Sequence, residues 1–143
     1  MKNELILLIR NQFDDLPELI KQADTFLDHH SVRLEALYKV NLILEEVLTN
    51  IIKYAFNDKS YHQIRVVMKL QDPELVIEFI DDGQEFDPLS MPPPKLAESI
   101  SESEVGGLGI HLVRQMSDGM EYHRHEDRNI LRTKIDLRST AHI

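Results

Sequence analysis

The stretch that decides the fold reads Leu44-Glu45-Glu46-Val47-Leu48-Thr49-Asn50-Ile51-Ile52-Lys53-Tyr54-Ala55. Its apolar residues recur at helical spacing, but Glu46 and Asn50 stand four residues apart on one helix face, and Lys53 follows about one turn later. Burying such side chains without partners costs about 1–3 kcal/mol each, so a helix that serves only the core rarely carries them in line. We expect a polar ligand to bind along this face; an ordinary solvated helix face is the alternative.

The composition narrows the class of protein. The 143 residues are 42% hydrophobic, which predicts one compact domain over residues 1–143 with its own core. The chain has no cysteine, which is typical of a reducing cytoplasm, and the apolar run 5–9 is too short for a signal peptide or a membrane span. The formal net charge of -9 argues against direct binding of nucleic acid or of an anionic membrane.

Hydrophobic periodicity predicts both strands and helices. Alternating apolar residues predict strands at 62–70, 75–80, 119–125 and 129–137, the first two as a hairpin. Helical spacing predicts helices at about 15–30, at about 31–55 with Ser31 as N-cap, and after the glycines at 106–107. Residues 4–10 are an N-terminal strand or a short helix. Residues 87–104 lack a periodic core pattern, as expected for a functional lid or a mobile segment.

A second polar element follows the predicted strand 75–80. Asp81 stands at the strand end, and Gly83 allows a tight turn and the close approach of a ligand. A carboxylate in this place can accept a hydrogen bond from an exocyclic amine such as that of adenine. The alternative is a plain turn, because Asp-Gly is a common turn dipeptide.

A third element, Gly106-Gly107-Leu108-Gly109, opens a predicted helix. A glycine-rich turn at a helix N-terminus presents free backbone N–H groups, and the helix dipole favours an anion there, so the pattern suits phosphate groups. It lacks the Gly-Lys-Ser/Thr element of a P-loop and does not follow the first strand of a dinucleotide-binding unit. A flexible hinge before a helix is the alternative.

In this order and spacing, the three elements resemble the ATP-binding domain shared by gyrase-type topoisomerases, histidine kinases, mismatch-repair ATPases and heat-shock chaperone ATPases. The matches are Glu46 and Asn50 to its Glu-x-x-x-Asn box, Asp81 and Gly83 to Asp-x-Gly, and Gly107 and Gly109 to Gly-x-Gly. Within this superfamily the chain looks most like the small anti-sigma-factor serine/threonine kinases of bacterial partner-switching systems. That closer likeness rests on Glu-x-x-Thr-Asn at 46–50, on Phe86-Asp87-Pro88 and on Gly106-Gly107-Leu108-Gly109-Ile110. The resemblance covers nearly the whole chain.

The resemblance implies a two-layer α/β sandwich, with a mixed, mostly antiparallel sheet covered by helices on one face. It implies that Glu46 is the catalytic base that activates the attacking hydroxyl, and that Asn50 ligates the Mg²⁺ that bridges the phosphates of ATP. Asp81 would bind the adenine amine, and Gly83 would leave room for the ring.

The remaining nucleotide contacts implied by the resemblance lie around these groups. They are Lys53, Phe86, Gly106, Gly107, Leu108, Gly109 and, in the adenine pocket, Thr133. An ATP lid would span about residues 87–106. Several relatives carry a basic residue just before the paired glycines, where this chain has Val105, so any lid cation that neutralises the γ-phosphate must come from elsewhere.

The implied function is that of an ATP- and Mg²⁺-dependent serine/threonine protein kinase. It would bind a sigma factor or an equivalent effector, act as an anti-sigma factor in transcription regulation, and phosphorylate a small antagonist protein on Ser or Thr. Relatives commonly dimerise, so a homodimer is expected. Two alternatives stay open: a nucleotide-gated protein-binding module without kinase activity, and a simple ATP hydrolase.

Overall fold

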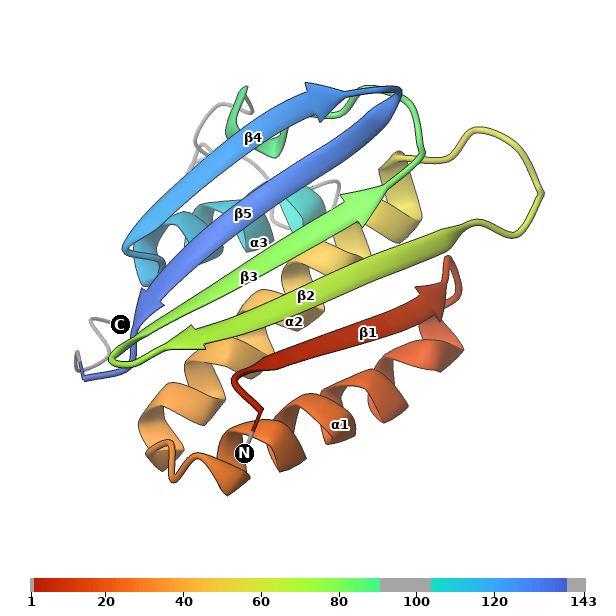
Figure 1. Cartoon of the computed structure of the whole chain (residues 1–143). Helices are drawn as coiled ribbons and strands as arrows, with labels where there is room; N and C mark the ends of the chain where they lie inside the picture. The colour runs from red at the N-terminus through yellow and green to blue at the C-terminus, as the bar shows by residue number, and fades with distance from the viewer. Residues whose placement is uncertain (1, 91–103, 139–143) are drawn as a thin grey trace.

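The computed structural model describes residues 2–90 and 104–138 and contains one sheet with helices on one of its faces (Figure 1). The elements are β1 (Glu4–Arg10), a 3-10 turn (Phe13–Asp15), α1 (Leu16–His29), α2 (Leu34–Tyr54), β2 (Gln63–Gln71), β3 (Glu74–Asp81), a 3-10 turn (Pro88–Ser90), α3 (Glu104–Met116), β4 (Gly119–His125) and β5 (Arg128–Asp136). The strand order is β1-β2-β3-β5-β4, and each neighbouring pair among these strands is antiparallel. The expected two-layer α/β sandwich is confirmed, with a more regular sheet than the mixed one we expected.

The connection between α1 and α2 differs from its prediction. Ser31 adopts a left-handed backbone with φ of 56°, and its N–H donates to the carbonyl of Asp28 while the N–H of Val32 reaches that of Leu27. This pattern closes the C-terminus of α1, so Ser31 is not the N-cap of α2. Arg33, in an extended conformation, takes that position and makes no side-chain capping bond.

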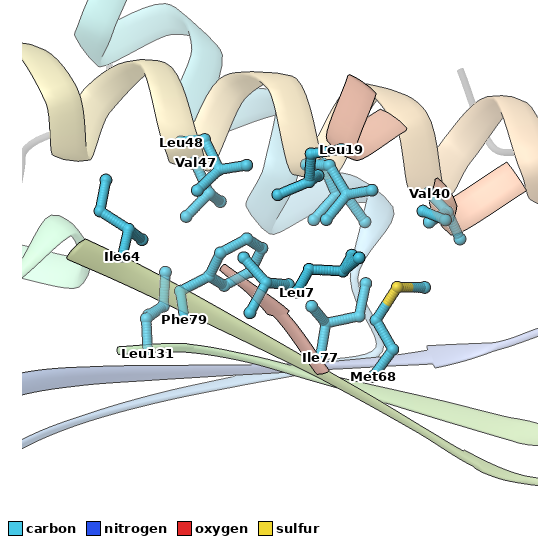
Figure 2. Close-up of a cluster of buried hydrophobic side chains, with 14 of the residues drawn as sticks. Leu7, Leu19, Val40, Val47, Leu48, Ile64, Met68, Ile77, Phe79 and Leu131 are labelled. Atoms are coloured by element: carbon cyan, nitrogen blue, oxygen red, sulfur yellow. The ribbon is translucent and has the colours of Figure 1, made fainter. Parts of the chain in front are cut away.

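The core lies between the inner face of the sheet and the facing stripes of the helices (Figure 2). Phe79 of β3 is fully buried at its centre, beneath Val47 and Leu48 of α2. Complete burial of one such side chain contributes about 1.5–3 kcal/mol. Leu34, which the helical spacing predicts to be part of the apolar stripe, is instead 80% exposed, because α2 begins there and projects past the edge of the core.

Several helices and strands begin or end at the same end of the sandwich. α2 and β3 end there, and β2 and β5 begin there, on the right-hand side of Figure 1. The strand register places Asp81, the last residue of β3, directly opposite Asn129 near the start of β5. Polar groups that are far apart in sequence therefore meet at this end.

The helix α3 packs on α2 and begins earlier than predicted. It starts at Glu104, so Gly106 and Gly107 lie in its first turn and not in a loop before it. Most of the predicted lid, residues 91–103, lies outside the described residues. Within the part of the chain that the structure describes, no helix has the length and apolar character needed to cross a membrane.

Candidate functional site

Asn50 is the most buried polar side chain of α2, with 1% of its surface exposed. Its Nδ2 donates to the backbone carbonyl of Glu46 at 2.8 Å, which fixes the carboxamide one turn along the helix. Its Oδ1 is buried and has no hydrogen-bond partner. A buried acceptor without a partner costs about 1–3 kcal/mol, and an oxygen of this kind suits a hard cation such as Mg²⁺.

Glu46 lies one turn before Asn50 and is half-buried. Partial burial raises the pKa of the Glu46 carboxyl, Glu45 adds to this effect, and the charge of Lys53 opposes it. A carboxylate with a raised pKa is a stronger base at neutral pH than an exposed one. The backbone of Gly109 in α3 comes so close that a Cβ there would lie 2.0 Å from Glu46 Oε2. The glycine-rich motif that contains Gly109 is therefore in contact with the motif that contains Glu46 and Asn50.

Asp81 is 3% exposed at the end of β3. Its Oδ1 accepts the N–H of Gly83 at 2.8 Å and Nδ2 of Asn129 at 2.9 Å. Burial raises the pKa of Asp81, while these two hydrogen bonds act in the opposite direction. Both of these hydrogen bonds end on Oδ1 of the Asp81 carboxylate.

Gly83 seats the loop that follows Asp81 on the C-terminus of α2. A Cβ at this position would lie 2.3 Å from the carbonyl oxygen of Ala55, which is impossible without a backbone shift. The same carbonyl accepts the N–H of Gln84 at 2.7 Å. The glycine is therefore required by the close approach of two backbones, whichever ligand binds there.

Asn129 of β5 is hydrogen-bonded to the end of β3, to the loop that follows β3 and to β4. The sequence did not point to this residue. Its Nδ2 donates to Asp81 and also to the carbonyl of Gln84 at 2.8 Å. Its Oδ1 accepts the N–H of Phe86 at 3.2 Å, the hydroxyl of Tyr122 and the guanidinium of Arg124. The one available signal was an amide side chain directly before the apolar pair Ile130-Leu131, which becomes meaningful only once the register sets it opposite Asp81.

Asn50, Asp81, Phe86 and Asn129 line one small cavity between α2 and the sheet. Its volume is about 10 Å³, close to the space of a single water-sized probe. An adenine ring is far larger than this cavity, so a residue of the cavity wall must move before a nucleotide can bind. Phe86 is the best placed to do so, because it is half-exposed and outside any helix or strand, with its ring 5.9 Å from that of Tyr54.

Other predicted residues stand apart from this cavity. Thr133 is fully buried four residues beyond Asn129, and its hydroxyl donates to the carbonyl of Ile77 at 3.4 Å. Lys53 is exposed and acts on the site through its charge near Glu46. Gly106, Gly107 and Leu108 lie in α3, and the structure describes their backbone alone.

Comparison with known protein families shows which class of protein this fold and site belong to. The sequence matches the histidine kinase-like ATPase domain over residues 9–135, so the chain belongs to that family. A blue-light activated histidine kinase of Erythrobacter litoralis shares the fold, with a TM-score of 0.54 and 21% identity over 74% of this chain. That match spans 32% of the larger histidine kinase.

Two curated relatives of this chain are named as protein kinases. The chain is 29% identical over 104 residues to the serine/threonine-protein kinase BtrW of Bordetella bronchiseptica, covering 73% of this chain and 72% of that protein. It is 25% identical to the serine-protein kinase RsbW of Listeria innocua, covering 70% of this chain and 66% of that protein. These likenesses support the anti-sigma-factor kinase branch that the motifs predict.

Proposed function

We propose that this protein is an ATP-dependent serine/threonine protein kinase that acts as an anti-sigma factor or a similar partner-switching regulator. The observation that carries the proposal is the pairing, in one cavity, of the unpartnered Asn50 oxygen with the buried Asp81 carboxylate. The first suits a metal-bound triphosphate and the second suits the adenine amine. The kinase names of BtrW and RsbW support the reaction.

Each side chain has a role in this proposal. Asp81 binds the adenine amine, and Asn129 holds the carboxylate in place. Asn50 Oδ1 would hold Mg²⁺, and a bound Mg²⁺ would supply charge neutralisation for the phosphates. Glu46 takes the proton of the attacking Ser or Thr hydroxyl, and the raised pKa of its carboxyl suits that task.

The phosphates are assigned to the N-terminus of α3. The first four N–H groups of any α-helix lack partners within the helix, and here they belong to Glu104, Val105, Gly106 and Gly107. Gly109, in the N-terminal half of α3, packs against Glu46, so this half of the helix lies beside the proposed base and near the proposed position of the phosphates. The lid over about 87–106 remains part of the proposal. At its described start, Arg114 donates to the carbonyl of Leu89 and ties this segment to α3.

The proposed partners follow from the relatives. They are a sigma factor or an equivalent effector, and a small antagonist protein that receives the phosphate on Ser or Thr. A homodimer, a cytoplasmic location and a single domain over 1–143 belong to the same proposal. A nucleotide-gated binding module without kinase activity is the second candidate, because Val105 stands where several relatives carry a cation.

Phosphotransfer from labelled ATP with Mg²⁺ to a candidate antagonist protein tests the proposal. The parental protein should label the antagonist on Ser or Thr. Glu46→Gln should bind ATP and transfer about 10²–10⁴-fold more slowly, the usual loss when a general base is removed. Asp81→Asn should bind adenine nucleotide weakly. ATP binding with no transfer to any antagonist, under conditions where a related kinase labels its own, would favour the binding module; steady phosphate release without a protein substrate would favour a hydrolase.

A further inference from the structure

His62 lies between two carboxylates at the end of the molecule that holds the candidate site. Its Nε2 is 2.8 Å from Asp58 Oδ1, in the loop after α2, and its Nδ1 is 3.0 Å from Asp82 Oδ1, just after β3. The side chain is 19% exposed, whereas the two aspartates are 52% and 55% exposed. The ring thus links two segments that are more than twenty residues apart in sequence.

The geometry favours the doubly protonated form of this histidine. An ionised carboxylate only accepts hydrogen bonds, and a neutral imidazole carries a single N–H. Two carboxylate oxygens at hydrogen-bond distance from the two ring nitrogens therefore require both nitrogens to donate. Only the imidazolium form of His62 satisfies both contacts at once. In agreement, the carboxylates raise the pKa of His62, with the hydrogen bond to Asp58 as the largest cause.

The ring is also held in position by its neighbours. It stacks on Phe56, with ring centroids 4.5 Å apart and planes 17° apart. The backbone N–H of His62 donates to Oδ1 of Asn11 at 2.9 Å, at the end of β1. A fixed ring can hold Asp58 and Asp82 at a constant separation.

The contact of His62 with Asp82 anchors the loop that carries Asp81. Asp82 is the next residue, and Gly83 and Gln84 then pack on the carbonyl of Ala55 at the end of α2. The loop is therefore attached to α2 on one side by backbone contacts and, through His62, to the loop that continues from α2. Loss of one attachment leaves the Asp81 carboxylate with more freedom.

Two carboxylates contact the His62 ring in the described part of the chain. Asp58 faces it from the loop after α2, and Asp82 faces it from the end of β3. From β1 the facing group is the neutral side chain of Asn11 through the backbone of His62. Asp82 also lines a surface hollow of about 160 Å³ together with two cationic residues, Arg65 of β2 and Arg128 of β5.

We propose that His62 is a positioning residue for the adenine site: as an imidazolium bridging Asp58 and Asp82, it holds the 81–84 loop in the geometry that binds nucleotide. The proposal rests on the proposed role of Asp81 in adenine binding. It predicts that nucleotide affinity decreases when His62 loses its proton, since a neutral ring keeps only one of the two bonds.

Nucleotide affinity measured by calorimetry from pH 6 to pH 9 tests this role. For the parental protein, the dissociation constant for ATP should rise by up to about fivefold across a single inflection, the range expected for an exposed ion pair. His62→Gln should bind at the weaker level throughout, because one amide nitrogen cannot donate to carboxylates on opposite sides. His123→Gln is the matched control, since His123 is exposed on β4 and its ring nitrogen lies 3.3 Å from the carboxylate of Glu121, a neighbour on the same strand. It should keep the parental profile. A parental profile in His62→Gln, or a flat profile in the parental protein, would overturn the proposal.

A second measurement does not depend on nucleotide. Proton NMR should show His62 titrating above the ordinary histidine pKa of about 6.5, and the amide signals of Gly83 and Gln84 should shift with the same midpoint. Amide signals that ignore the His62 titration would exclude the mechanical link. A protein that shows this link but binds no ATP at any pH would contradict the proposed function and leave the bridge intact.

Discussion

At the residue scale, Glu46 combines partial burial with a position between α2 and α3. Burial and Glu45 raise the pKa of its carboxyl, and in the proposed mechanism Glu46 can take a proton only in its deprotonated form. The rate of phosphotransfer should therefore fall as the pH drops through a pKa above the ordinary glutamate value of about 4.3. Measuring kcat/KM from pH 5 to pH 8 checks this. Lys53→Gln should move the midpoint to higher pH, because the opposing positive charge is lost; an unchanged midpoint would remove Lys53 from the site.

Asn129 and Thr133 offer a contrast on a single strand. Asn129→Ala removes two hydrogen bonds donated to Asp81 and Gln84, and leaves the buried Asp81 carboxylate with one donor fewer. The free energy of unfolding should decrease by about 1–3 kcal/mol, and nucleotide affinity should decrease with it. Thr133→Val keeps the shape and loses one long bond to Ile77, so nucleotide affinity should change little. Urea unfolding and calorimetry measure both effects. A larger loss of affinity in Thr133→Val would restore Thr133 to the adenine pocket.

At the scale of elements, two glycines mark close approaches of different kinds. Gly83→Ala drives a methyl group into the backbone of Ala55 at the end of α2, which cannot yield without moving the helix end. Gly109→Ala meets the end of the flexible Glu46 side chain, which can rotate away.

The two alanine variants should therefore fail in different ways. Gly83→Ala should lower the free energy of unfolding by about 1–3 kcal/mol through overpacking. Gly109→Ala should fold nearly normally but transfer phosphate slowly, because its methyl group displaces the proposed base. Thermal unfolding and phosphotransfer assays on both proteins check this. Equal losses of stability in the two variants would contradict the distinction.

At the scale of the whole molecule, ligand binding should increase the free energy of unfolding. ATP with Mg²⁺ at about 100 times its dissociation constant should add about 2.7 kcal/mol, which corresponds to a Tm increase of roughly 5–10 °C for a domain of this size. Asn50→Ala should lose the part of this increase that depends on Mg²⁺. Asn41→Ala is the matched control, because Asn41 is on the same helix but lines a different groove, between α1 and α2. A Tm increase that is the same with and without Mg²⁺ in the parental protein would contradict the metal role of Asn50.

Local patterns in the sequence predicted most of the architecture. The alternation of apolar residues located β2, β3, β4 and β5, and helical spacing located α1 and α2, because each of these elements buries one face. The boundaries that failed depend on groups outside the element. Ser31 ends α1 because its N–H bonds backward, and Leu34 is exposed because the core stops before it. Neither fact can be read from periodicity.

By itself, the sequence determined the chemistry available: an i, i+4 carboxylate and carboxamide, an Asp-x-Gly turn and a glycine-rich helix start. Tertiary structure decided which of these groups meet. Strand register set Asn129 opposite Asp81, and helix packing brought Gly109 against Glu46. It also inserted His62 between Asp58 and Asp82. The physical reason is that spacing within one element follows from its own periodicity, whereas contacts between elements depend on how the whole core packs.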